Sequence, residues 1–419
     1  MPAAADAERC FWRVSTAGIL FQGGAAAVDT STVVASLVGG LTGNSAFAVG
    51  AAAALARFGW LFPQLFVAYH AQRHARRLPF YVAGAFGRVA CLIGLAGLLW
   101  LAPAPSGEST VVLFFALWTV YAFVSGLVAV PYNDIVGRSI LSDRRSRMLA
   151  LRFFGGGLLT LTVASAAHRV LAALPFPLGH ATLLLLGAAL LLASAVSFVS
   201  AGEPRASPPP SAALSFRGFL RQGASTLRRD HRFRLFVVAQ WFGSAAALAL
   251  PFYVLLAARP TQDVALLLGA QTVGALLSNP LWGWWGDRLG KRSLLEGAAA
   301  LGMLAPRLAL AWIAGVGRQE EVGALPYFAA VFALLGAAGN GGTIAMLGYL
   351  MEISPDERRP AYSGYFNALV APAALLPMAG GAVAQAGSLA TVFMVSLVAA
   401  ALQFLAVRRL RAVPDGDDE

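Results

Sequence analysis

The chain has 419 residues, of which 58% are hydrophobic and only 12% are charged, and its mean hydropathy is +0.68. An ordinary soluble domain carries about 25% charged residues, so this composition excludes a soluble globular protein. The formal net charge is +11, and a basic chain can bind nucleic acid or follow the charge rules of membrane insertion.

Long apolar runs recur along the whole chain. A helix needs about 20 apolar residues to cross the hydrocarbon of a bilayer. The runs are continuous and lack the period-two alternation of a membrane barrel, which predicts helices. The sequence therefore predicts an all-α membrane protein with twelve transmembrane helices near residues 14–38, 44–69, 78–102, 109–132, 147–173, 181–200, 233–257, 263–286, 293–315, 325–351, 361–386 and 389–407.

The basic residues concentrate in alternate loops between these helices. With the amino terminus inside, 24 of the 31 Lys and Arg residues fall in cytoplasmic segments, whereas only Arg169, Arg259 and Arg318 fall at outer positions. By the positive-inside rule, this asymmetry predicts that both termini are cytoplasmic. We expect the protein to lie in the inner membrane of a bacterium. Topology thus explains the net charge, and no nucleic-acid partner is required.

Residues 201–232 differ in composition from the rest of the chain. Pro208-Pro209-Pro210 interrupts any helix there, and the following mixture of Phe and Arg favours a short amphipathic helix on the inner leaflet. A solvated tether is the alternative. We expect an N-terminal six-helix half at 1–200, a cytoplasmic linker at 201–232, and a C-terminal six-helix half at 233–419 with a short cytoplasmic tail.

Two short motifs recur about 215 positions apart. Residues 283–292 read Gly-Trp-Trp-Gly-Asp-Arg-Leu-Gly-Lys-Arg, and residues 68–77 keep only the basic positions of this string. Asp143-Arg144-Arg145 likewise returns as Glu357-Arg358-Arg359. These offsets indicate a duplicated membrane protein whose halves repeat in the same orientation. The string at 283–292 resembles the loop signature of the major facilitator superfamily, and the match is specific in the second half only.

The resemblance implies a fold and a mechanism. It implies two pseudo-symmetric six-helix bundles and a secondary transporter that works by alternating access, without naming a substrate. It also implies that the signature loop latches the halves together in the outward-facing state, the alternative being a plain topology-setting basic loop. The residues so assigned to gating are Gly283, Asp287, Arg288, Gly290, Lys291, Arg292, Arg73 and Arg77.

Ionisable residues inside predicted helices are the strongest indications of function, because each costs about 3 kcal/mol at the centre of a helix on the insertion scale. At the helical rise, Asp29 lies about 22 Å and Arg57 about 18 Å above the inner helix ends. The matching depths predict an ion pair, in which Asp29 carries a coupling proton and Arg57 favours its ionised form. A permanent structural pair is the alternative.

Three further arginines, Arg88, Arg152 and Arg307, lack obvious acidic partners at matching depth. Guanidinium groups facing a cavity suit a carboxylate, phosphate or sulfate, which favours an anionic solute. The family places the helices of Arg88 and Arg307 at the periphery, which argues against this interpretation. Arg152 is close enough to an inner helix end to snorkel or to pair with Asp134, and we group it with Asp134 and Glu352 as inner-face ion pairs.

Neutral polar side chains complete the predicted substrate and proton pathway. An amide both donates and accepts hydrogen bonds, which suits hydroxyl-bearing or amide-bearing solutes. Hydrogen bonding between helices is the alternative for any one of these residues. The candidates are Gln22, Gln240, Trp241, Asn340 and Asn367, joined by Gln271 and Asn279.

The remaining chemistry-bearing residues do not indicate an enzyme. The five histidines do not cluster, and His70 and His74, although spaced as a zinc pair, have no acidic third ligand nearby. We expect no cofactor and no metal. The leading prediction is a proton-coupled secondary transporter of a small organic solute that contacts only solute, proton and membrane lipids and works as a monomer. The alternative is a non-transporting scaffold or lipid or assembly factor on the same fold.

Overall fold

The computed structural model describes residues 2–71, 74, 76–101, 107–140, 142–203, 215–257, 263–316, 324–354 and 359–410. Within these ranges the chain is almost entirely helical and contains no β-strand. The first half forms α1 (Pro2–Ala27), α2 (Val33–Leu41), α3 (Ala46–Ala71), α4 (Leu78–Leu101), α5 (Glu108–Gly126), α6 (Ala129–Ser139), α7 (Ser142–Ala173) and α8 (Leu178–Ala201).

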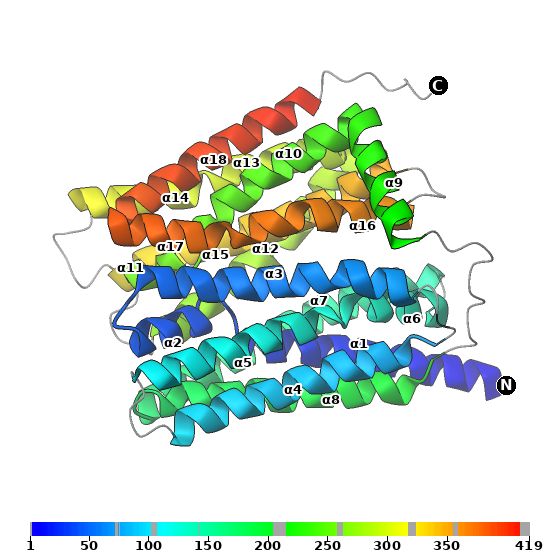
Figure 1. The fold of residues 1–419 in the computed structure, drawn as a ribbon, viewed down its shortest axis with the longest axis horizontal. Helices are drawn as coiled ribbons and strands as arrows, with labels where there is room; N and C mark the ends of the chain where they lie inside the picture. Colours follow the sequence, from blue (N-terminus) through cyan, green and yellow to red (C-terminus); the bar gives the residue numbers. More distant parts are fainter. Residues whose placement is uncertain are drawn as a thin grey trace.

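The second part of the chain forms a comparable set of helices. Figure 1 shows the helices of the two halves as two layers that lie against each other along their length. We call the end of the molecule that carries α6 and α9 the α9 end, and the opposite end the α2 end. The helices are α9 (Phe216–Arg229), α10 (His231–Ala246), α11 (Phe252–Ala257), α12 (Asp263–Arg288), α13 (Gly290–Gly302), α14 (Leu304–Ala311), α15 (Ala324–Ile353), α16 (Arg359–Val370), α17 (Leu376–Ala386) and α18 (Leu389–Arg409).

The membrane spans follow the predicted ones closely. Eleven segments in the described part of the chain are long and apolar enough to cross a bilayer, from Ala46–Val67 to Leu389–Arg409. They coincide with the second to twelfth predicted helices to within a few residues, except that the segment Glu108–Ser139 continues through α6. The predicted fold class, an all-α membrane protein of two six-helix bundles, is confirmed.

The first predicted helix, at 14–38, is not continuous. α1 ends at Ala27 and α2 begins at Val33, and residues 28–32 form turns between them. The backbone N–H of Val34 bonds back to the carbonyl oxygen of Asp29 at 2.9 Å, and the carboxylate of Asp29 accepts from residues that follow it. A backbone break at membrane depth is tolerated only where protein or a cavity satisfies the freed groups. This break therefore places Asp29 on a loop rather than on a helix face.

Glycines allow the closest approaches between helices. A Cβ atom on Gly336 of α15 would lie 1.8 Å from the carbonyl oxygen of Gln271, and one on Gly274 of α12 would lie 2.0 Å from that of Ala333. Between the halves, a Cβ on Gly50 of α3 would lie 2.2 Å from the carbonyl oxygen of Pro377. Lipid gives helices no hydrophobic reason to associate, so such backbone contact supplies much of the packing energy.

A helix forms at Phe216–Arg229, as predicted, and α9 contacts both halves. Ser215 caps it by accepting a hydrogen bond from the N–H of Gly218 at 3.1 Å. The Phe216 ring stacks on Phe66 of α3, with ring centroids 5.5 Å apart. Further along, Gly223 lies directly under the ring of Tyr365 on α16. α9 thus crosses from one half to the other at the α9 end (Figure 1).

The α12 and α15 contact yields a stability prediction. Gly336→Ala forces a methyl group against the backbone of α12, and we expect it to lower the free energy of unfolding by about 1–3 kcal/mol, the usual cost of overpacking. Gly342→Ala on the same helix is the control, because no neighbouring atom of the described residues lies within 4 Å of a Cβ there. Thermal unfolding in detergent measures both variants. Equal melting temperatures for the two would contradict this packing arrangement.

Candidate functional site

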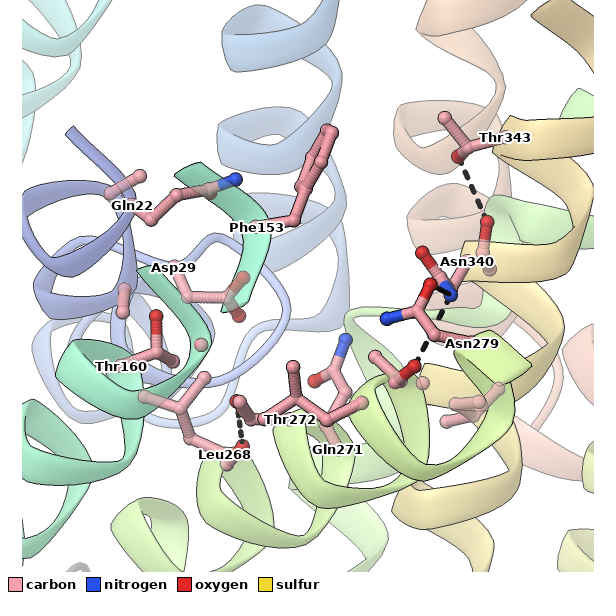
Figure 2. Close-up of a pocket in the computed structure, with 18 residues that line it drawn as sticks. Gln22, Asp29, Phe153, Thr160, Leu268, Gln271, Thr272, Asn279, Asn340 and Thr343 are labelled. Atoms are coloured by element: carbon pink, nitrogen blue, oxygen red, sulfur yellow. Dashed lines mark hydrogen bonds between the residues drawn. The ribbon is translucent and has the colours of Figure 1, made fainter. Parts of the chain in front are cut away.

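A cavity of about 430 Å³ lies between the two halves. α1, the turns at residues 28–32 and α7 form one wall, whereas α12 and α15 form the other. Figure 2 shows polar side chains from both walls turned toward the same space. We call it the central cavity, and its polar lining residues are Gln22, Asp29, Thr160, Gln271, Thr272, Asn279, Asn340 and Thr343.

Asp29 is the single carboxylate among these lining residues. Its Oδ1 atom accepts hydrogen bonds from the backbone N–H of Ser31 at 3.0 Å, the Ser31 hydroxyl at 2.7 Å and the Thr32 hydroxyl at 2.8 Å. Its Oδ2 atom makes no hydrogen bond with the described residues. The carboxylate is therefore held in place through one oxygen, while the other is available to a proton or a ligand.

Amides form the opposite wall of the central cavity. The Asn340 side chain on α15 donates to Asn279 Oδ1 at 2.9 Å and to the carbonyl oxygen of Ala275 at 3.2 Å, so it ties α15 to α12. The buried Oε1 atom of Gln271 has no hydrogen-bond partner among the residues that the structure describes. Gln22 contributes from α1 (Figure 2). The structure thus brings four of the predicted amides together in one cavity.

A second cavity, of about 350 Å³, lies inside the first half. It is lined from α1, α3, α4, α5 and α8, and we call it the side cavity. Arg57 and Arg88 both line it, and it shares Ala25 and Asp29 with the central cavity. The predicted ion pair between Asp29 and Arg57 is wrong: no contact within 4.0 Å joins them, because the break after Ala27 turns the carboxylate toward Ser31 and Thr32.

A cluster of charges joins three helices, α4, α6 and α8, at the α9 end. Asp134 Oδ2 on α6 lies 3.3 Å from Arg77 Nη1 and 2.5 Å from Arg138 Nη2. Glu203, just after α8, accepts from Arg138 Nη2 at 2.9 Å and from the backbone N–H groups of Arg77 at 2.8 Å and Leu78 at 3.0 Å. Its carboxylate therefore caps the start of α4.

The environment of Glu203 sets its ionisation. Burial alone raises the pKa of this carboxyl, but the backbone N–H of Arg77, the Arg138 guanidinium and the N–H of Leu78 together hold the pKa below its usual value. A depressed pKa means that the ionised form stabilises the folded protein. The ionised Glu203 carboxylate thus stabilises the contact between the end of α8 and the start of α4.

Arg152 does not pair with Asp134, which corrects that prediction. Its Nη1 atom donates to the Tyr132 hydroxyl at 3.1 Å, and its guanidinium lies over the rings of Tyr132 at 5.2 Å and Phe21 at 5.7 Å. Asp134 instead binds Arg77 and Arg138 through its Oδ2 atom. Glu352 is exposed near the end of α15, and no ion pair joins it to another described residue.

The signature loop forms a sharp turn between α12 and α13. Gly290 has φ +84°, a backbone conformation that favours glycine, which explains this glycine in the motif. Arg292 Nη1 reaches the carbonyl oxygen of Leu410 at 3.5 Å, and the Lys291 side chain packs over Gly348 of α15. Gly283 and Arg288 are exposed. Arg73 and the side chain of Asp287 lie outside the described residues, and the latch remains a prediction.

Several predicted pathway residues lie away from both cavities. Trp241 donates from its indole nitrogen to the carbonyl oxygen of Leu369 at 3.0 Å, which ties α10 to α16. Gln240 and Asn367 are partly buried, and Arg307 is exposed on α14. These four residues, Gln240, Trp241, Asn367 and Arg307, do not line the central or the side cavity.

The sequence reasoning missed other lining residues. Phe21, Trp118, Tyr121 and Ser125 line the side cavity but look like ordinary core positions in an apolar sequence. The ion pair of Arg138 with Asp134 was predictable, because residues four positions apart on a helix lie side by side and these two carry opposite charges. The described residues contain no group of three or more His, Cys, Asp or Glu side chains that could hold a metal ion.

Comparison with known proteins agrees with this geometry. Residues 247–419 match the family model of the Major Facilitator Superfamily. This match covers less than half of the 419 residues, so it is the C-terminal part of the chain that is similar to this family. Solved structures of similar fold include a mutant of the nucleoside transporter NupG, with a TM-score of 0.73 and 12% identity over 96% of this chain and 99% of that one. A D-xylose-proton symporter has a TM-score of 0.71 and 14% identity, over 97% of this chain and 98% of the symporter.

Among curated proteins, the chain is similar to the uncharacterized protein Rv2209 of Mycobacterium tuberculosis, at 25% identity over 309 residues, which is 73% of this chain. The match spans 59% of the length of that relative. An uncharacterized protein of Mycobacterium bovis matches equally well. The chain is thus a multi-pass membrane protein that shares its fold with the solved transporters named above.

The charge cluster at the α9 end yields a pH-dependent prediction. Glu203→Gln removes charge-assisted hydrogen bonds, and we expect a loss of about 1–3 kcal/mol in unfolding free energy at pH 7. Because the folded pKa of Glu203 is depressed, its stabilisation exists above the unfolded value of about 4.3 and disappears as the pH falls through the folded pKa. Melting temperatures of Glu203→Gln and of the unmodified protein, recorded from pH 7 to pH 3, measure this loss of stabilisation.

The matched control is Glu108→Gln, since Glu108 is an exposed carboxylate at the start of α5. Its melting temperature should follow that of the unmodified protein at every pH. A constant difference between Glu203→Gln and the unmodified protein across the whole pH range would show that the Glu203 charge is not the origin of the stabilisation.

Proposed function

We propose that this protein is a secondary transporter that moves a small organic solute by alternating access, driven by protons, with Asp29 as the proton carrier. The observation that carries the proposal is the position of Asp29. It lies on a break in the first helix, between the two halves, with one carboxylate oxygen held and the other without a partner among the described residues.

The break supports a transport role for physical reasons. Transporters commonly build their binding sites near the membrane midplane from interrupted helices at the interface of two repeats. A carboxylate in such a site is costly to bury when ionised, so uptake of a proton and closure of the cavity favour each other. Asp29 borders both cavities, so its charge acts on a solute in either one.

The opposite wall suits recognition of a polar, uncharged part of a solute. The amides of Gln271, Asn279 and Asn340 offer donors and acceptors from α12 and α15. α12 and α15 are held together by glycine contacts and by the Asn340 hydrogen bonds, so they form a stiff wall. Rocking of one half against the other then exposes the cavity to either side of the membrane. We place both termini in the cytoplasm, following the distribution of basic residues.

The experiment starts with a thermal-shift screen of the purified protein against metabolites, because a cavity ligand stabilises the state it binds. A solute that raises the melting temperature is then tested in proteoliposomes with an imposed pH gradient. We expect Asp29→Asn to abolish gradient-driven accumulation down to the level reached without a gradient, while exchange of labelled for unlabelled solute continues. Asn keeps the hydrogen bonds of Oδ1 but cannot carry the proton.

Asp6→Asn is the matched control, because Asp6 is an exposed carboxylate paired with Arg9 near the start of α1. It should accumulate solute as the unmodified protein does. Accumulation that survives in Asp29→Asn contradicts the assignment of Asp29. A protein that binds no solute and shows no flux supports instead a scaffold or lipid or assembly factor on this fold.

A further inference from the structure

The side cavity carries more positive than negative charge. Arg57 on α3 and Arg88 on α4 line it, and Asp29 is the one carboxylate among its lining residues. Within the described ranges, no carboxylate lies within 4.0 Å of either guanidinium. Two cations and one anion leave one positive charge without a counter-ion, in a part of the protein where uncompensated charge is costly.

Arg88 is the more unusual of the two arginines. Its side chain is among the largest fully buried ones, with 2% exposure for the residue, and its Nε atom has no hydrogen-bond partner in the described part of the chain. Its guanidinium lies over the Phe21 ring, 5.1 Å from the centroid. A ring face compensates only a small part of the cost of burying a guanidinium. Buried polar groups without partners in a native fold point to a missing ligand, an ion or water.

Other donors face the same space. Ser125 on α5 is 6% exposed and lies beside Tyr121, and among the described residues no group meets the geometry of a hydrogen bond to its hydroxyl. Arg57, in contrast to Arg88, is exposed although it lies in the interior of the bundle, because it borders the cavity. Trp118 and Tyr121, stacked with ring centroids 4.8 Å apart, add an aromatic wall. Guanidinium and hydroxyl groups around an aromatic cavity favour an oxyanion on a small organic body.

We propose that the side cavity is a binding site for a carboxylate or another oxyanion, held by Arg57, Arg88 and the hydroxyl of Ser125. The cavity volume of about 350 Å³ accommodates a small organic acid as well as an inorganic ion. The anion has two sources. The first is the charged group of the transported solute, and this interpretation rests on the proposed function. The second is a free inorganic anion, and this interpretation is independent of the proposed function.

The test uses the purified full chain in detergent, with acetate, benzoate and sulfate as probes and benzamide as the uncharged analogue of benzoate. We expect benzoate or sulfate to raise the melting temperature in a saturable way, as required of a ligand that binds the folded state, and benzamide to leave it unchanged. Quenching of tryptophan fluorescence follows the same binding, since Trp60 and Trp118 line the cavity. Equal shifts with benzoate and benzamide would overturn the proposal.

Variants locate the site. Arg57→Gln and Arg88→Gln should each weaken anion binding by at least about tenfold, because each removes a positive charge that lines the cavity. Arg57→Lys keeps the charge and should retain most of the affinity. Arg307→Gln is the matched control, since Arg307 is a membrane-helix arginine that lines neither cavity. If Arg88→Gln does not fold, the anion affinity of Arg57→Gln alone tests whether the site lies in the side cavity. Unchanged affinity in Arg57→Gln contradicts the assignment.

Asp29→Asn separates this inference from the proposed function. Loss of a neighbouring negative charge should strengthen anion binding severalfold, whatever happens to transport. Anion binding without proton-driven flux leaves the side cavity as an anion site and removes the transport role. Proton-driven flux without any anion binding supports the transport role and removes the anion site from the side cavity. Uptake of labelled benzoate into proteoliposomes identifies the solute as the source, whereas binding of sulfate alone identifies a free inorganic anion.

Discussion

The interruption of the first span after Ala27 is the constraint that organises this site. Inside a bilayer a backbone N–H or carbonyl without a partner costs several kcal/mol, so a helix breaks only where other groups replace its hydrogen bonds. Here Asp29 supplies them, since its carbonyl oxygen accepts from Val34 and its Oδ1 atom accepts from Ser31 and Thr32. The same residue that repairs the break therefore presents a carboxylate to two cavities.

The second structural requirement is a rigid frame around that break. In lipid, helix association depends on close packing and polar contacts. The glycine contacts of α12 with α15 and the Asn340 hydrogen bonds make the second wall of the central cavity stiff. The Glu203 carboxylate similarly fixes α4, which carries Arg88, to the end of α8. The charged residues are thus held by elements whose positions are set far from the cavities.

Much of the fold was predictable from the sequence, because eleven spans are determined by length and hydropathy alone. The break at 28–32 was not, since Thr, Ser and Asp in an apolar run also fit a continuous helix. The predicted Asp29 and Arg57 pair rested on a uniform rise per residue, which the break invalidates. The predicted Asp134 and Arg152 pair failed because Arg138, on the same helix, is closer. The amides Asn279 and Asn340 were found because polar groups in spans are few, whereas the aromatic wall of the side cavity has no polar signal.

The charges of the site are distributed unevenly between the two halves, and this asymmetry has a consequence for coupling. The first half supplies Asp29, Arg57 and Arg88, whereas the second half lines the central cavity with neutral groups. With Asp29 ionised, the side cavity has one excess positive charge, and with Asp29 protonated it has two. A bound oxyanion offsets the charge that a proton on Asp29 adds, so proton and anion favour each other's binding in the low-dielectric interior. In the proposed transport cycle, the two ligands would move as a nearly neutral pair, which lowers the cost of carrying either one across the membrane.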